Sequence, residues 1–342
     1  MKKTFAVILS LILLLSCVPA GAACAEEKEI NVVTTIFPIY DWVREIVGDD
    51  AAHVKIDLLL DNGVDLHSYQ PSAQDILAIS TADVFIYVGG ESDEWVEDVL
   101  ASAMNPDLKA INLVESMGDD IKAEEVVEGM EHEHEHDHED EEGHDHEEED
   151  HDHEHEEEDE ADEHVWLSLR CAEKLTRVIA DVLAGIDPDH AEHYQKNAAA
   201  YLEKLADLDA RYTETVNNAA FRTLLFGDRF PFRYLADDYG LTYYAAFSGC
   251  SAESEASFAT IVFLAQKVDE LKLPAVMTIE HPKTRIAETV VQNTATKDQK
   301  ILAMDSMQGP TAADIQSGTT YLSVMEANLE VLKEALNLTK RG

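Results

Sequence analysis

The chain has 342 residues, a formal net charge of −45, and a composition that is 45% hydrophobic and 7% aromatic. This length suffices for two domains of ordinary size, and the composition is typical of an α/β protein. The excess of acidic side chains argues against nucleic acid as a partner and favours cations. Part of the charge is local, since Glu131 to Glu163 holds 22 acidic side chains and no Lys or Arg.

Residues 1–24 have the pattern of an export signal. Two lysines are followed by an apolar run from Phe5 to Leu15 and then by small residues, which is the order of regions in a secretory leader. We therefore expect the mature protein to work outside the cytoplasm. Cys17 and Cys24 each follow a small residue, as in lipoprotein processing, so we expect a lipid anchor at one of them, with free secretion as the alternative. No later apolar stretch approaches the roughly 18 residues of a membrane span.

Residues 28–186 alternate strands with helices, as expected of a first α/β lobe. Apolar runs predict strands at 30–36, 53–60 and 83–90, and apolar residues at helical spacing predict helices at 39–47, 71–82 and 94–104. This alternation predicts a parallel sheet. Functional loops are then expected at the carboxyl ends of its strands.

Residues 187–218 contain no Gly and no Pro after Pro188, and they predict one long helix. At about 1.5 Å per residue it would span about 45 Å, enough to connect two lobes stiffly. Residues 219–342 repeat the alternation of strands and helices and end in a helix at 320–338. The sequence thus predicts two α/β lobes with parallel sheets, joined by a long rigid helix.

A histidine-rich acidic tract interrupts the first lobe. It has almost no apolar residue with which to build a core, so we expect a disordered loop over residues 124–163. Imidazole groups among carboxylates attract divalent cations, and the tract is expected to capture metal weakly at several places. The alternative is a solvated acidic loop without a binding role. The nine histidines are His132, His134, His136, His138, His144, His146, His151, His153 and His155.

Two histidines outside the tract have the positions of functional residues. His67 lies in a loop directly after the apolar strand at 53–60 and before a helix, where an α/β lobe places its binding residues. His164 opens the segment HVWLSL, at the end of the tract. In contrast, His53 is expected to be exposed, and His190 and His193 lie among polar residues at the start of the long helix.

The chain resembles a known family, the metal-binding proteins of bacterial ABC importers for zinc and manganese (ZnuA-type, cluster A-I). VVTTIFPIYDWVREIVGD is similar to the opening strand and helix of the family, NGVDLHSYQPSAQD to its G-x-D-x-H-x-Y-x-P signature, and DEHVWLSL to its D-x-H-x-W-L segment. The resemblance covers the mature chain and implies a metal site in the cleft between the lobes. It also implies that His67 and His164 are ligands, with His164 the first ordered residue after the tract.

The resemblance leaves the third and fourth ligands open. Where the family has a histidine or glutamate, strict counting gives Arg229, which cannot bind a cation. Its neighbour Asp228 is therefore the expected ligand, with the alternative that it caps a helix or pairs with an arginine. Asp305 matches a ligating aspartate of the family at the end of a late strand. Glu280 and His281 are reserves, and Glu253 matches a position expected to be structural.

The function that the resemblance implies is capture of one metal ion and its delivery to an ABC permease with its ATPase. Two histidines with two carboxylates suit zinc, with manganese as the alternative, and the tract favours zinc. A metal buffer or adhesin without a transport role is a second alternative. A metallohydrolase is the rival from another class, but the chain has no H-E-x-x-H and no G-x-S-x-G motif, so we expect no enzyme.

Three further expectations concern the mature protein. It is expected to be a monomer. Cys171 and Cys250 either form a disulfide or remain two buried thiols. Protonation of His67 and His164 is expected to compete with the metal once the pH falls below about 6.5.

Overall fold

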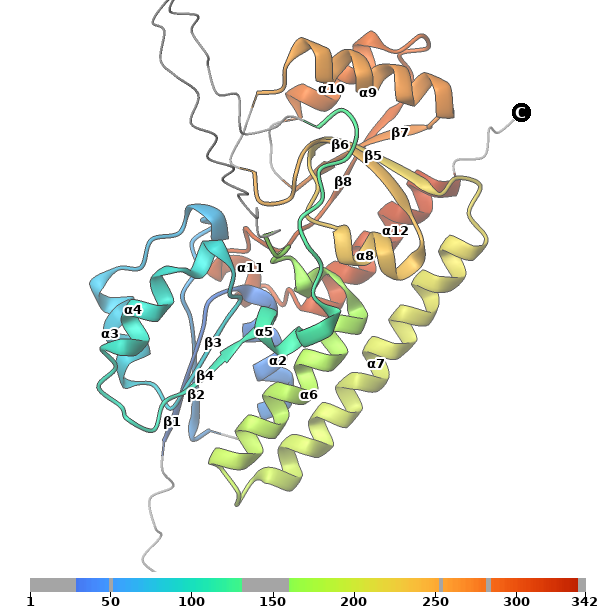
Figure 1. Ribbon diagram of the computed structural model, residues 1–342. Coiled ribbons are helices and arrows are strands. Elements are labelled where there is room, and N and C mark those ends of the chain that lie inside the picture. Colours follow the sequence, from blue (N-terminus) through green and yellow to red (C-terminus); the bar gives the residue numbers. More distant parts are fainter. Residues whose placement is uncertain (1–28, 49–51, 131–159, 252–254, 281–283, 338–342) are drawn as a thin grey trace, which may run out of the picture.

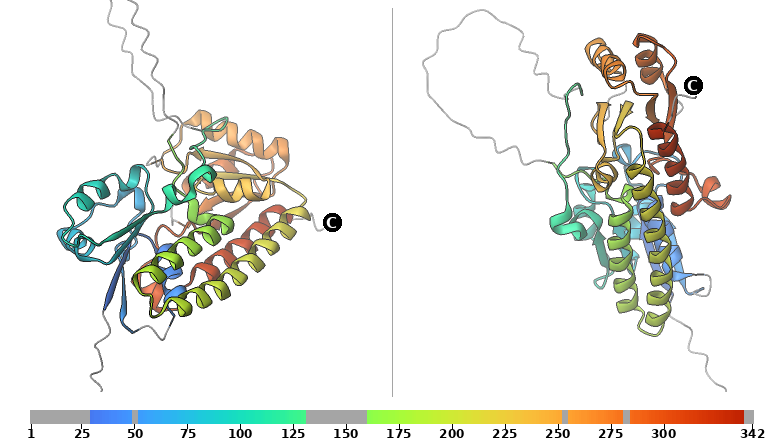
Figure 2. Two further views of the ribbon diagram at one scale, coloured as in Figure 1. Left: turned by 60° about the horizontal axis from the view of Figure 1, so that its bottom comes forward. Right: turned by 90° about the vertical axis from the view of Figure 1, so that its right-hand side faces the viewer.

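A computed structural model describes residues 29–48, 52–130, 160–251, 255–280 and 284–337. It has two lobes, and the long helix α7 (Ala191–Asn217) runs along both of them (Figure 1). In the side view of Figure 2, α7 lies beside α6 (Leu169–Ile186) over the length of α6. These two helices form one side of the molecule.

The N-terminal lobe contains a parallel sheet in the order β2-β1-β3-β4. Its strands are β1 (Ile30–Thr34), β2 (Val54–Leu58), β3 (Val84–Tyr87) and β4 (Lys109–Asn112). Its other helices are α2 (Phe37–Val47), α3 (Ala73–Thr81), α4 (Trp95–Ala101) and α5 (Leu113–Met117), with the 3-10 turns η1 (Leu66–Ser68), η2 (Glu91–Asp93), η3 (Gly118–Asp120) and η4 (Val165–Leu167). The start of α3 is fixed by a capping box between Ser72 and Asp75.

The C-terminal lobe repeats this strand order, as β6-β5-β7-β8, again in parallel. The strands are β5 (Thr223–Arg229), β6 (Thr242–Phe247), β7 (Ala275–Ile279) and β8 (Lys300–Met304). The helices are α8 (Arg233–Tyr239), α9 (Phe258–Leu271), α10 (Arg285–Asn293), α11 (Ala312–Gln316) and α12 (Tyr321–Asn337). In both lobes the first strand has its two successors on opposite sides, which is the arrangement that opens a binding crevice at the carboxyl ends of the strands.

One hydrophobic core runs through both lobes. Val32 and Phe226 belong to this shared core. Neighbouring residues of a strand point to opposite faces of the sheet, so the residue next to each of them faces a different core. Val33 points to a smaller core under α3 and α4, and Leu225 to another under α9 and α10. The inner faces of the two sheets are therefore covered by one continuous layer that includes α2, α6, α7 and α12.

The C-terminal part of the chain returns to the N-terminal lobe after β8. The backbone N–H of Ala312 donates to the carbonyl of Asp61 at 2.7 Å, and that of Tyr321 donates to the buried Asp41 carboxylate at 2.8 Å. Tyr321 also donates its hydroxyl to the carbonyl of Trp166, at 2.8 Å. The described segment after β8 thus contacts the N-terminal lobe, and α7 is one of several connections that hold the lobes together.

The two α/β lobes with parallel sheets predicted from the sequence are confirmed. The long helix predicted at 187–218 corresponds to α7, after a separate α6 that ends at Ile186. The structure differs from the prediction at the end of the tract, because ordered chain begins before His164: Asp162 and Glu163 are 2% and 1% exposed. Glu163 accepts the backbone N–H of Ser92, and Asp162 accepts the backbone N–H of His164 and contacts its ring atom Nδ1. These contacts offset the cost of burying the two carboxylates.

Several expectations lie outside the described residues. These are the leader with Cys17 and Cys24, the nine histidines of the tract, and two candidate residues of the C-terminal lobe, Glu253 and His281. Cys171 and Cys250 are described, and both are free thiols. Within the described part of the chain, no helix combines the length and the apolar character needed to cross a bilayer.

Candidate metal centre

Loops from the carboxyl ends of both sheets meet at one point between the lobes. His67 lies in η1, after β2 of the first sheet, and Cys250 follows β6 of the second. His164 immediately precedes η4, where the chain re-enters the N-terminal lobe. Although they are far apart in the sequence, these three residues place one potential ligand atom each within 4.8 Å of the other two.

Hydrogen bonds fix both the backbone and the ring of His67. The Asp65 carboxylate accepts a hydrogen bond from its backbone N–H at 3.1 Å, and its ring atom Nδ1 lies 2.7 Å from Ser92 Oγ. Burial, reinforced by the neighbouring His164, lowers the pKa of His67 to about 3. The imidazole is therefore neutral, as a metal ligand must be, well below the pH of about 6.5 expected from the sequence.

His164 is completely buried, at 0% exposure. One oxygen of Asp162 accepts its backbone N–H at 2.8 Å and lies 3.0 Å from its ring atom Nδ1. The ring also packs against Trp166, with 5.1 Å between the ring centroids. A carboxylate at Nδ1 orients a histidine so that Nε2 faces a metal, which is the usual outer-shell partner of a histidine ligand.

The Nε2 atoms of His67 and His164 are 3.2 Å apart. Two nitrogens bound to one tetrahedral zinc at about 2.0–2.1 Å are separated by about 3.3 Å, so the pair already has the spacing of two zinc ligands. The amide oxygen of Gln308 lies 3.1 Å from His164 Nε2 when its nitrogen donates to Asp65. A cation that binds between the rings must take the place of this contact.

Asp228 and Asp305, the expected third and fourth ligands, are not brought into this group. Among the described residues, the sets of His, Cys, Asp and Glu with ligand atoms within 4.8 Å of one another contain neither. The Asp228 carboxylate accepts hydrogen bonds from the backbone N–H groups of Arg229 (2.9 Å) and Ile279 (3.3 Å). Asp305 accepts the backbone N–H of Met307 at 2.8 Å. Their role as ligands stays a prediction that requires their side chains to move toward the histidines.

Arg229 and Glu280 also have defined partners. Arg229 Nη2 donates to Asp65 at 2.6 Å and so links the two lobes next to His67. Glu280 accepts hydrogen bonds from the backbone and the hydroxyl of Ser306, at 2.8 and 2.7 Å. Both side chains are therefore fixed in ion pairs or hydrogen bonds at the carboxyl ends of the second sheet.

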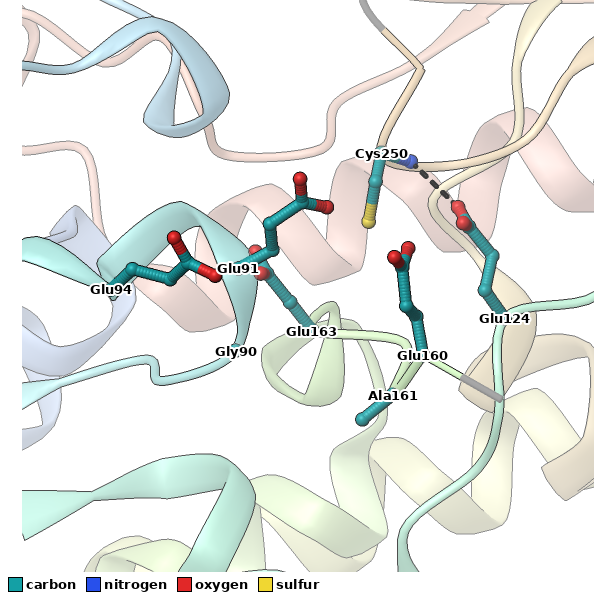
Figure 3. A pocket seen from close by; sticks show the side chains of 8 residues that line it. All are labelled: Gly90, Glu91, Glu94, Glu124, Glu160, Ala161, Glu163 and Cys250. Carbon is teal, nitrogen blue, oxygen red and sulfur yellow. Dashed lines mark hydrogen bonds between the residues drawn. The ribbon is translucent and has the colours of Figure 1, made fainter. Parts of the chain in front are cut away.

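An acidic cavity of about 270 Å³ adjoins the histidines. Figure 3 shows its lining, with the side chains of five glutamates and Cys250 around one space: Glu91, Glu94, Glu124, Glu160 and Glu163. Glu163 is buried, its Oε2 has no hydrogen-bond partner, and this atom lies 3.8 Å from His67 Nδ1. The cavity and the histidine pair are thus contiguous, and the carboxylates give the approach to His67 a negative potential.

A second cluster at the far end of α6 and α7 joins His53, Asp187 and His190. The Asp187 carboxylate accepts hydrogen bonds from His53 Nε2 at 2.8 Å, from His190 Nδ1 at 3.1 Å and from the hydroxyl of Tyr194. The sequence prediction that His53 is exposed is wrong, because its side chain is 7% exposed and paired with Asp187. Because Asp187 already accepts these hydrogen bonds, we interpret the cluster as a structural contact and not as a metal site.

The family model for the zinc-uptake complex component A, periplasmic (ZnuA), matches residues 32–335. The chain belongs to the ZnuA family. It is 30% identical over 316 residues to the high-affinity zinc uptake system protein ZnuA of Bacillus subtilis, with 92% of this chain and 90% of the relative covered. It is 34% identical over 330 residues to the zinc-binding lipoprotein AdcA of Streptococcus pneumoniae. That match covers 95% of this chain but 60% of AdcA, so the chain spans about three fifths of this relative.

The structure resembles solved structures of the ZnuA family. The Zn(II)-bound ZnuA-like domain of Streptococcus pneumoniae AdcA superposes with a TM-score of 0.67 at 30% identity, covering 90% of this chain and 99% of that domain. The ZnuA resemblance inferred from the motifs around His67 and His164 is confirmed. Neither Cys250, which was expected only as a disulfide partner or a buried thiol, nor Glu163 was predicted as part of the centre, since neither lies in a spacing typical of a metal motif.

Proposed function

We propose that this chain is the extracytoplasmic zinc-binding component of an ABC importer, which captures one ion between its lobes and passes it to a membrane permease driven by an ATPase. The proposal rests on the 3.2 Å spacing of His67 and His164 Nε2 in a chain of the ZnuA family. The printed functions of the AdcA and ZnuA relatives, zinc binding and zinc uptake, support it.

His67 and His164 are the proposed primary ligands. Each ring has its Nδ1 next to a polar partner, Ser92 Oγ or the Asp162 carboxylate, which leaves Nε2 of both rings directed at the same point. Asp228 and Asp305 remain proposed further ligands that would close on the ion from the C-terminal lobe. In this arrangement, binding would draw groups of both lobes together and so favour a closed state by its differential affinity.

The nine histidines of the tract would act as an accessory collector. The tract lies outside the described residues, and Glu160, which follows it in the sequence, lines the acidic cavity together with Glu163, whose Oε2 lies 3.8 Å from His67 Nδ1. An ion released from the tract would therefore meet a negatively charged space before it reaches the histidine pair. A lipid anchor at Cys17 or Cys24 would keep the protein at the membrane surface close to its permease.

The test is a comparison of metal content and competitive zinc affinity. The full chain would be measured beside a form in which a Gly-Ser linker replaces residues 131–159, with His164→Ala introduced into both. One tightly bound zinc that survives the replacement and is lost with His164→Ala supports the proposal. His193→Ala is the matched control, because this histidine contacts the carbonyl of Val47 on the α2 side of α7.

Two alternatives remain distinguishable in the same experiment. A manganese-specific protein would retain manganese in preference to zinc when both metals compete. If tight binding disappeared with the tract and His164→Ala had no effect, a metal buffer would explain the chain better than an importer component. Loss of zinc uptake on deletion of the gene, restored by the wild type and not by His164→Ala, would establish the transport role.

A further inference from the structure

We propose that the Cys250 sulfur is a third ligand of the ion held by His67 and His164, so that the site selects a thiophilic divalent cation such as zinc over manganese. The proposal rests on the proposed function and assigns a residue that the expected ligand set did not contain.

The position is the first argument. The potential ligand atoms of His67, His164 and Cys250 all lie within 4.8 Å of one another. Among the described residues, this potential metal-binding group is the one that contains the histidine pair. Zinc bonds of about 2.0–2.1 Å to nitrogen and about 2.3 Å to sulfur place these atoms about 3.6 Å apart. A movement of about 1 Å, within reach of a rotation of one side chain, is enough to close the set around an ion.

The loop after β6 passes close to His164, which also supports the assignment. A Cβ on Gly249 would lie 3.0 Å from His164 Cε1 and 3.0 Å from the carbonyl oxygen of Phe230, so a residue without a side chain is needed at this distance. The next residue, Cys250, donates its backbone N–H to Glu124 Oε1 at 3.1 Å. This hydrogen bond ties the loop to the N-terminal side of the tract and orients the thiol toward the site.

The surroundings of the Cys250 thiol also support the assignment. Cys250 lines the acidic cavity (Figure 3), and its sulfur belongs to the group with the histidine pair. The sulfur would bind the cation as a thiolate, with its proton leaving to solvent.

The competing ligands are less well placed. The Asp228 and Asp305 carboxylates accept backbone hydrogen bonds from Ile279 and Met307 and lie outside the group, whereas the Cys250 sulfur, which has a backbone hydrogen bond from Glu163, already lies in the group with the pair. Two imidazoles and a thiolate form a softer set than two imidazoles and two carboxylates. Soft sulfur ligands favour zinc and copper, while manganese prefers carboxylates and water.

Cobalt(II) absorption of the full chain tests the proposal. Cobalt bound by a thiolate gives a sulfur-to-metal charge-transfer band in the near ultraviolet, which histidines and carboxylates of the tract do not give. We expect the band in the wild type and in Cys171→Ser, and its loss in Cys250→Ser. Cys171 is the matched control because it is a buried free thiol of α6 that does not belong to the group.

Two further measurements accompany the spectrum. Zinc should slow alkylation of Cys250 in the unmodified protein, as quantified by mass spectrometry of its peptide, which needs no variant. Cys250→Ser should weaken zinc binding at least about tenfold, as loss of a partner of a metal site does, with a smaller change for manganese.

Two results would overturn the assignment. If the band is absent and Cys250→Ser binds zinc like the wild type, while His164→Ala abolishes binding, Cys250 is not a ligand although the importer function stands. If the wild type retains no tightly bound zinc or cobalt, the proposed function fails together with this inference.

Discussion

The Nε2 atoms of His67 and His164 lie 3.2 Å apart although 97 positions separate the two residues in the chain. Neither ring can place both nitrogens in water, because the side chains are 8% and 0% exposed. Without a cation, one ring must donate to the other or to Gln308. With a cation, both lone pairs are used at once, so this pair is a site whose hydrogen bonding is completed by binding.

The groups that orient the two rings should contribute to affinity. We expect Ser92→Ala and Asp162→Ala each to weaken zinc binding by about 10–100-fold, because each removes the hydrogen bond at Nδ1 that fixes a ring. Competition with a chromophoric chelator measures the change. Ser102→Ala is the control, since its hydroxyl bonds only to carbonyls of α4; equal affinities in all three variants would contradict the assigned orientation roles.

The stability of the metal-free protein should fall as the pH is lowered. The pKa of His67 is about 3 in the folded protein and about 6.5 in the unfolded chain. Between these values the unfolded state binds more protons, so the free energy of unfolding decreases on acidification, by up to about 1.4 kcal/mol per pH unit from this group. Urea denaturation in chelator at pH 7 and pH 5 measures this.

His67→Gln removes the titrating group and tests that attribution. We expect the variant to lose less stability between pH 7 and pH 5 than the wild type. If both proteins lose the same amount, another group is responsible for the acid sensitivity. Saturating zinc should leave the contribution of His67 to this pH dependence unchanged, because its ring is already unprotonated in the metal-free folded protein at both pH values.

A side chain at Gly249 should disturb the centre without unfolding the lobe. The Cβ of Gly249→Ala would press on His164 and on the carbonyl of Phe230, both at 3.0 Å, and should push the loop that carries Cys250 away. We expect weaker zinc binding with a loss of stability of about 1–3 kcal/mol. Gly185→Ala is the control, because a Cβ there meets nothing within 4 Å and α6 gains a better helix former. Unchanged zinc affinity in Gly249→Ala would show that the close approach is unimportant.

Asp187 should support the structure and not the metal site. Burial would raise its pKa, but hydrogen bonds from Tyr194, His53 and His190 outweigh this effect and lower the pKa to about 2. The stabilisation is therefore complete above about pH 4 and is lost as the pH falls toward 2. We expect Asp187→Asn to lower the free energy of unfolding by about 1–3 kcal/mol, with unchanged zinc affinity in the linker-replaced protein. A loss of bound metal in this variant would instead identify a second binding site.

Most of the elements could be predicted because their signals are local. The alternation of buried strands with capped helices is visible in β1, α3 and β5, and the motifs around His67 and His164 identified the family. Other contacts could not be predicted. Asp162 and Glu163 look like the end of a solvated tract, yet both are buried, and Glu163 accepts a hydrogen bond from the distant backbone N–H of Ser92. The sequence shows that Asp228 and Asp305 lie at the ends of strands, but it does not show the direction in which their carboxylates point.

The sequence by itself determined the α/β class, the two lobes and the histidine-rich tract, because periodicity and composition act over a few neighbouring residues. Only the tertiary structure decided which groups surround the centre. Cys250 is a single cysteine with no motif around it, and it reaches the histidine pair because β6 ends beside the re-entry of the chain at His164. Such a meeting depends on the packing of two sheets across one shared core, which no local pattern encodes.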